Sequence, residues 1–355
     1  MNAYPRRHSR YTSAILSALV GGGFVWWFLA GVSLPTVAAE IRLSRLPYLT
    51  AAVLLSLSGF AFRTWRWQQL LGPLKWIPAR RVASAIFIGW AASAVLPGRV
   101  GEVARAWILG REGIRRSAAF GTIVLERLLD ILAVLLLFAA SVAVLPAAST
   151  AQSPLMVAIR TGALLTFCAL MLVGLLLLAA HHVPGALLRR LKEWAGRLPY
   201  GVGHRALGMI EAFGRGLSAA LTDSPSAGAG SASPRTVVAL HTAVLWMIIC
   251  GVHALLFRAF ALEVSALRIP IMLLLITMGL AVPVPAALGS YHKAVQIGLA
   301  VLFGVPQNTA AAYAIVSHLI TQVLPAVIGA TLLAREGLAL SSLAGGSAAS
   351  RSLDE

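Results

Sequence analysis

The sequence predicts an all-α polytopic membrane protein, and three observations lead to this fold class. Hydrophobic residues make up 59% of the 355 residues and charged residues only 12%. The mean hydropathy of +0.83 leaves too little polar surface to cover a soluble globule of this length. The apolar residues also fall in long runs, and most Lys and Arg residues lie between those runs. We therefore expect about six full spans and two interrupted ones.

The same features exclude several classes of function. A formal net charge of +17 favours a nucleic-acid partner only when the basic residues gather on one soluble face. Here they punctuate apolar runs, so we expect no nucleic-acid partner. Both cysteines, Cys168 and Cys250, lie inside apolar runs, which favours neither a disulfide framework nor a zinc site. No P-loop, GxSxG or HExxH pattern occurs, so we expect no catalytic residue and no cofactor.

Six apolar runs are long enough to cross a membrane as single helices, for which about 20 residues are needed. These predicted spans are residues 13–34, 46–62, 117–146, 155–180, 236–257 and 309–334. Arg6, Arg7 and Arg10 precede the first run as in a signal sequence, but the run has full-span length and no clear cleavage site. We predict an uncleaved first helix.

Two further apolar regions, 82–109 and 270–303, are each interrupted by Pro and Gly. The first contains LPGRVGE and the second contains PVPAALGS. The apolar part before Pro97 rises only about 22 Å as a helix, against a hydrocarbon core of roughly 30 Å. Each region is therefore either one kinked span or a re-entrant hairpin of two half-helices.

The positive-inside rule favours the hairpins. With both regions re-entrant, most basic residues, including those of a cytoplasmic amphipathic segment and linker at 185–235, fall on the side of the N- and C-termini. The two hairpins then enter from opposite faces, as in an inverted repeat, where paired Gly/Pro-interrupted segments mark a transporter's substrate site. We predict one membrane domain over residues 1–340 and a disordered tail over 341–355.

The first group of candidate site residues lies at the first hairpin tip. Pro97 suits a tip because it lacks a backbone donor, and the planar fork of Arg99 suits a phosphate or carboxylate. Glu102 and Arg105 lie three residues apart and share one helical face. The alternative is that these charges snorkel to the cytoplasmic interface.

A second group of charges lies inside the span 117–146. Arg127 and Asp130 are spaced to form an ion pair, and Glu126 lies one turn before Asp130. Ionisable residues within a span are costly and by default indicate function. The alternative is a structural ion pair one to two turns inside the interface.

The sequence near the end of the second span is rich in tryptophan and arginine. Trp65, Trp67 and Trp76 stand beside Arg63 and Arg66. Such a combination is typical of an anchor at the membrane interface.

The second half of the chain carries weaker candidates. His318 and Gln322 lie four residues apart in the last span, although His318 also suits a packing histidine. At the second tip, Lys293 either attracts an anionic headgroup or snorkels outward. The candidates of this half are Pro285, Gly289, His292, Lys293, His318 and Gln322.

These motifs resemble a known family. LPGRVGEVARAWIL, then GTIVLERLLDIL, then PAALGS followed by LFGVPQNTAAAYAIVSHLI are similar to the lysylphosphatidylglycerol synthetase transmembrane (flippase-like) family. The strings from Pro97 to Arg105 and from Glu126 to Asp130 match it residue by residue. At the second tip, Ala286 and Ala287 replace glycines that the family commonly has, and His292 stands near its acidic position. This departure indicates a divergent branch, one associated with hopanoid or other isoprenoid lipids.

The resemblance implies a stand-alone translocase in a bacterial inner membrane that moves a polar lipid between leaflets, because nothing after Gly337 would fold into an aminoacyl-transferase domain. Its partner would be the lipid substrate, with a homo-oligomer or lipid-biosynthetic enzymes as further candidates. Two alternatives stay open. One is a lipid-modifying enzyme with Glu126, Asp130 or His318 as acid or base, and the other is a scaffold of a lipid-biosynthetic complex.

Overall fold

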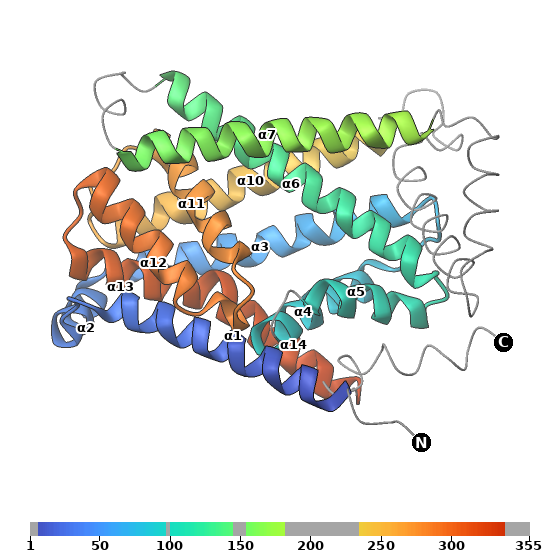
Figure 1. Cartoon of the computed structure of the whole chain (residues 1–355), viewed down its shortest axis with the longest axis horizontal. Coiled ribbons are helices and arrows are strands. Elements are labelled where there is room, and N and C mark those ends of the chain that lie inside the picture. The colour runs from blue at the N-terminus through green and yellow to red at the C-terminus, as the bar shows by residue number, and fades with distance from the viewer. Residues whose placement is uncertain (1–5, 97–99, 145–153, 182–233, 338–355) are drawn as a thin grey trace.

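The computed structural model describes residues 6–96, 100–144, 154–181 and 234–337, and these ranges are helical with no strand (Figure 1). The all-α prediction is therefore confirmed for them. The predicted segment 185–235 lies outside the described residues up to position 233, and so does the predicted tail.

Four described helices are long and apolar enough to cross a membrane. They are α3 (Leu46–Leu71), α6 (Arg116–Val144), α10 (Pro234–Ala259) and a nearly continuous segment that joins α13 (Gln307–His318), the π-helical turn η6 (Leu319–Val323) and α14 (Leu324–Arg335). Figure 1 shows α3 and α10 running along the long axis of the molecule, with α6 crossing at an angle. This composition is that of a multi-pass membrane protein.

The first predicted span differs from its observed helices. α1 (Arg6–Leu29) ends before α2 (Leu34–Leu43), and the two helices are bent by 77°. Gly31 ends α1 with a φ of 75°, and Pro35 stands in the first turn of α2, which is where each residue type is favoured. Counted as one broken span, the pair is a fifth candidate.

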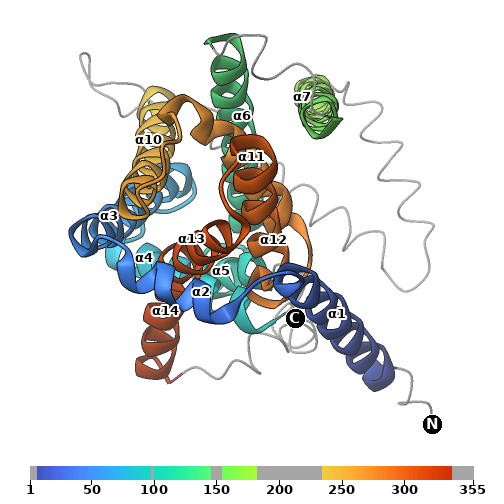
Figure 2. The same cartoon turned by 90° about the vertical axis from the view of Figure 1, so that its left-hand side faces the viewer.

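The predicted span 155–180 coincides with α7 (Pro154–His181), a helix of 28 residues. Its described apolar part, Met156–Cys168, is shorter than a span. α7 stands at the edge of the bundle, beside α6 (Figure 2). The expectation of six full spans thus stays a prediction, with four or five supported by the described residues.

Each interrupted region forms two short helices that pack against each other. The first region contains α4 (Ala79–Val95) and α5 (Val100–Arg111). The second contains the turn η3 (Ala266–Arg268), α11 (Ile269–Ala281), the turn η4 (Pro285–Ala287), α12 (Ser290–Ile297) and the π-helical turn η5 (Gly298–Leu302). With 12, 13 and 8 residues, α5, α11 and α12 are individually too short to cross a membrane, and α4, with 17 residues, is at the lower limit of length.

The two halves of the chain interlock. α3 lies beside α10 in both views (Figures 1 and 2), α4 packs on α14, and α11 packs on α6. One apolar core lies mainly within the second half, among α10 to α13, and a smaller one lies among α3, α4, α5 and the start of α6. The interrupted regions are therefore surrounded by longer helices.

The backbone of α4 touches its two neighbours directly. A Cβ atom on Gly101 of α5 would overlap the carbonyl oxygen of Gly89, and one on Gly329 of α14 would overlap that of Phe87. No side chain fits at either contact, so glycine is required there. α4 is consequently held between α5 and α14 by backbone contact.

Candidate functional site

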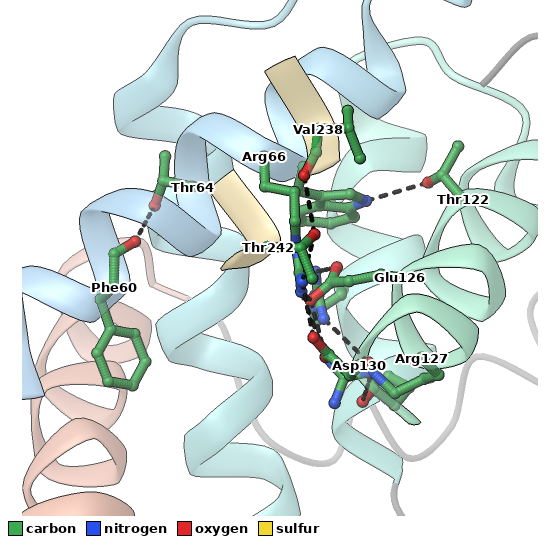
Figure 3. A network of polar contacts seen from close by, with 12 residues as sticks. Phe60, Thr64, Arg66, Thr122, Glu126, Arg127, Asp130, Val238 and Thr242 are labelled. Atoms are coloured by element: carbon green, nitrogen blue, oxygen red, sulfur yellow. Dashed lines mark hydrogen bonds and ion pairs between the residues drawn. The ribbon is translucent and has the colours of Figure 1, made fainter. Parts of the chain in front are cut away.

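A group of six charged side chains, four of them buried, joins α3, α5 and α6, and we call it the ion-pair cluster. Its members are Arg66, Glu102, Arg105, Glu126, Arg127 and Asp130. Figure 3 shows four of them, Arg66 from α3 and Glu126, Arg127 and Asp130 from α6, pointing toward one another. Five of the six are predicted site residues, and Arg66 is the additional member.

Arg66 is the centre of the cluster. Its Nη1 donates to Oδ1 of Asp130 at 2.7 Å, and its Nη2 donates to Oε1 of Glu126 at 3.0 Å. Thr242 of α10 accepts a further bond from Nη1 at 3.4 Å. The Arg66 side chain is 0% exposed, so these carboxylates supply the compensation that a buried guanidinium requires.

Two further arginines bind the same carboxylates. Arg105 Nη2 donates to Glu126 Oε2 at 2.7 Å, and its Nη1 donates to Glu102 at 3.1 Å. Arg127 Nη2 lies 2.7 Å from Glu126 Oε1 and 3.3 Å from Asp130 Oδ2. The predicted pairs between residues 102 and 105 and between residues 127 and 130 are therefore present. Three cations face three anions, so the cluster as a whole is neutral.

The local sequence explains why these groups meet. Glu126 and Asp130 are one helical turn apart on α6, with Thr122 one turn before them on the same face. The hydroxyl of Thr122 accepts a bond from Trp67 Nε1 at 3.0 Å. Arg105 places its guanidinium carbon 4.0 Å from the centroid of a Trp67 ring, which is a cation–π contact.

The interpretation of Arg66 and Trp67 as interfacial anchors was wrong. Both side chains are 0% exposed. They belong to α3, which continues to Leu71, beyond the predicted end at residue 62. The helical spacing of Phe60, Trp67 and Leu71 is a signal for this extension, since it places apolar residues on one continuous face.

A cavity of about 450 Å³ adjoins the cluster. On one side it is lined by Gly89, Trp90, Ser93, Glu102, Arg105 and Arg127, from α4, α5 and α6. On the other side it is lined by Pro283, Ala286, Leu288, His318 and Gln322, from the second tip and the C-terminal helical segment. Both interrupted regions thus contribute to one cavity, and five of the predicted site residues reach it.

Two histidines meet at the second tip. The rings of His292 and His318 have centroids 4.4 Å apart. His318 Nε2 lies 2.8 Å from the carbonyl oxygen of Ala286, and Gly289 N lies 3.3 Å from His292 Nδ1. Ala286 has a φ of 51°, a conformation that costs a non-glycine residue free energy.

Residues 14–329 match the family model described as lysylphosphatidylglycerol synthase TM region. The chain belongs to this family. No curated protein matches it. As a member of the lysylphosphatidylglycerol synthase membrane family, the protein is membrane-associated and related to lipids, in agreement with its apolar helices.

Not every predicted site residue of this family member reaches the cavity. Lys293 turns toward Trp27 of α1, with its Nζ 4.9 Å from the centroid of a Trp27 ring, and Nζ also donates to Gln296 of its own helix at 2.8 Å. Pro285 and Gly289 lie in the tip without lining the cavity among the described residues. Pro97 and Arg99 fall on positions 97–99, outside the described residues.

The chemistry of this family member's cavity follows from its lining. One wall carries charged side chains of both signs, from Glu102, Arg105 and Arg127. The guanidinium groups of this wall suit a ligand with oxygen acceptors. The remaining lining is mostly apolar. A polar group attached to an apolar body fits both parts.

Proposed function

We propose that the protein moves a lipid with a polar headgroup between the leaflets of a bacterial cytoplasmic membrane. The observation that carries the proposal is the cavity, in which the charged wall of Glu102, Arg105 and Arg127 faces the His318 side within an apolar bundle. Its volume of about 450 Å³ suits a headgroup rather than a whole lipid. The tails would remain in the bilayer while the headgroup is sheltered from hydrocarbon.

The proposal includes a membrane placement. The α4–α5 and α11–α12 pairs enter from opposite faces as re-entrant hairpins, so that their irregular tips line a cavity instead of contacting lipid. The α5–α6 connection and the start of α10 lie at one end in Figure 1, and the α10–η3 connection lies at the other. The excess of basic residues assigns the first of these ends to the cytoplasm.

This placement predicts the labelling of two exposed positions. In a background with Cys168 and Cys250 replaced by alanine, Ser265→Cys is expected to react with an impermeant thiol reagent added to intact cells. Arg115→Cys, at the opposite end, is expected to react only after the membrane is opened. Labelling of Arg115→Cys in intact cells would contradict the orientation.

Lipid movement is tested with purified protein in vesicles that contain a fluorescent phospholipid. Glu102→Gln is expected to slow exchange between leaflets by about 10- to 100-fold, because a charged contact is worth about 1.5–3 kcal/mol and each tenfold factor corresponds to about 1.4 kcal/mol. Glu102 lines the cavity and is 24% exposed, so folding should be affected less than transport.

Glu112→Gln is the matched control. Glu112 follows the same helix and pairs with the half-exposed Arg81 at 3.5 Å, away from the cavity. It is expected to leave the exchange rate unchanged. Equal losses in both variants would argue for a scaffold, and a chemically altered lipid in mass spectra would argue for an enzyme.

A further inference from the structure

The two contacting histidines differ in their hydrogen bonds. A carbonyl oxygen only accepts, so the contact between His318 Nε2 and Ala286 O at 2.8 Å requires the hydrogen of His318 to be on Nε2. A backbone N–H only donates, so the contact from Gly289 N requires Nδ1 of His292 to be free of hydrogen. His318, which lines the cavity, therefore keeps a basic nitrogen at Nδ1, whereas the basic nitrogen of His292 already accepts a bond.

The groups on the same side of the cavity do not compensate a charge on His318. Neither α11 nor Ser17–Leu29 of α1 contains a titratable residue. On α12, the Tyr291 hydroxyl donates to Ser317, and Lys293 turns toward Trp27. No described carboxylate forms an ion pair with either histidine.

More distant groups on the packed helices are also engaged. On α13, Tyr313 is bonded to His253 of α10 at 2.8 Å. Glu40 of α2 accepts a bond from Thr309, at the other end of α13 from His318. Both contacts lie outside the cavity lining. Among the described residues, the charged groups that His318 faces are thus those of the opposite cavity wall, together with Arg63 of α3, whose guanidinium lies 5.2 Å from the centroid of a ring of the wall residue Trp90.

On the opposite wall, the charges of the ion-pair cluster are already balanced, and the nearby Arg63 is held over Phe60 and Trp90 by cation–π contacts. Glu102, Arg105 and Arg127 belong to the neutral ion-pair cluster, in which every guanidinium has a carboxylate partner. A headgroup with one negative charge would enter a cavity that offers no surplus cation from this cluster. Among the described residues, no charged side chain lines the cavity on the His318 side, so one proton on His318 Nδ1 supplies a cation there.

From this geometry we infer that His318 is a proton-binding site whose protonation accompanies entry of an anionic headgroup. A proton from water binds the lone pair of Nδ1, Nε2–H stays on the Ala286 carbonyl, and the proton leaves when the headgroup leaves. The proximity of the His292 ring, with centroids 4.4 Å apart, limits the pair to one added proton. The anion in this inference rests on the proposed function, whereas proton uptake by His318 does not.

Proton uptake is measured by NMR of histidine-¹⁵N-labelled full-length protein in phosphatidylcholine nanodiscs, with His318→Gln and His292→Gln assigning the signals. His318 is expected to become charged at a higher pH than His292, and at a still higher pH when phosphatidylglycerol is included. The inference would be overturned if His318 stays neutral at every pH of the titration, or if His292 becomes charged at a higher pH than His318.

Coupling is measured as leaflet exchange of a fluorescent phosphatidylglycerol. We expect the rate to rise on the order of tenfold as the pH is lowered from about 8 to about 5, because imidazoles in proteins change charge within this interval. The His318→Gln variant is expected to lose this rise, so that its exchange rate is the same at high and low pH. His253→Gln, which alters a buried histidine outside the cavity, should keep it.

The two levels of failure are distinguishable. Absence of exchange in the unaltered protein at every pH would overturn the proposed function and the coupling, while the NMR titration still decides whether His318 binds a proton. If lipid exchange by the His318→Gln variant still rises at low pH as in the unaltered protein, this inference is overturned and the proposal of lipid movement is left intact.

Discussion

Arg66→Met is expected to lower the free energy of unfolding by about 3–5 kcal/mol, because removing one member of a buried ion pair leaves an uncompensated charge. Arg66 is 0% exposed and bonds both Glu126 and Asp130. Glu126 keeps two other arginines, but Asp130 keeps only Arg127 at 3.3 Å among its ion pairs. Asp130 therefore carries most of the loss. The difference in the free energy of unfolding between the variant and the unaltered protein is measured by unfolding both in mixed micelles.

The double variant Arg66→Met with Asp130→Leu sharpens this test. Since it removes both charges, we expect it to be more stable than Arg66→Met alone. Arg81→Met is the control, because that side chain is 49% exposed and its surface ion pairs are worth about 0–1 kcal/mol. A double variant less stable than the single one would contradict this account of the cluster.

Arg127→Gln is expected to reduce lipid exchange by about 10- to 100-fold, because a charged hydrogen bond contributes about 1.5–3 kcal/mol and each tenfold factor is about 1.4 kcal/mol. Arg127 lines the cavity and is 29% exposed, more than the other two arginines of the cluster. Its loss should affect stability less than loss of Arg66, because Glu126 and Asp130 both retain Arg66. Vesicle exchange and unfolding are measured on the same preparation.

Arg111→Gln provides the comparison for this prediction. Arg111 ends α5 and lies over Trp107, outside the cavity lining. Its substitution should leave exchange unchanged. If the two variants exchange lipid equally fast, Arg127 does not contact the headgroup and the cluster only holds the helices together.

Local spacing was sufficient to predict much of the site. The pair between Arg127 and Asp130 follows from one turn of helix, and so does that between Glu102 and Arg105. The partner of Asp130 at 2.7 Å is 64 positions away in the sequence, on another helix. No periodicity within one segment reveals such a contact, so Arg66 emerged only from the packing of α3 on α6.

The ends of the helices also depend partly on local sequence signals and partly on packing. Hydropathy placed the second span over 46–62 because Arg63 lowers the average, whereas the helix continues to Leu71 through buried Trp67 and Leu70. The bend after α1 had a local signal in Gly31 and Pro35. A long apolar run obscured it, because apolar composition alone does not distinguish one straight helix from two bent ones.

The glycine contacts of α4 constrain how the cavity changes shape. Gly101 and Gly329 bring two backbones against α4 with no room for a methyl group, so a slide of one residue would drive side chains into main-chain atoms. α4, α5 and α14 must therefore move apart before any of them can shift in register relative to the others. The second tip also contains a close backbone contact, between Gly289 and α1, but at Ala286 a φ of 51° stores free energy that an extended backbone would release. The contacts among α4, α5 and α14 therefore resist a change in register, whereas the backbone at Ala286 would gain free energy by changing its conformation.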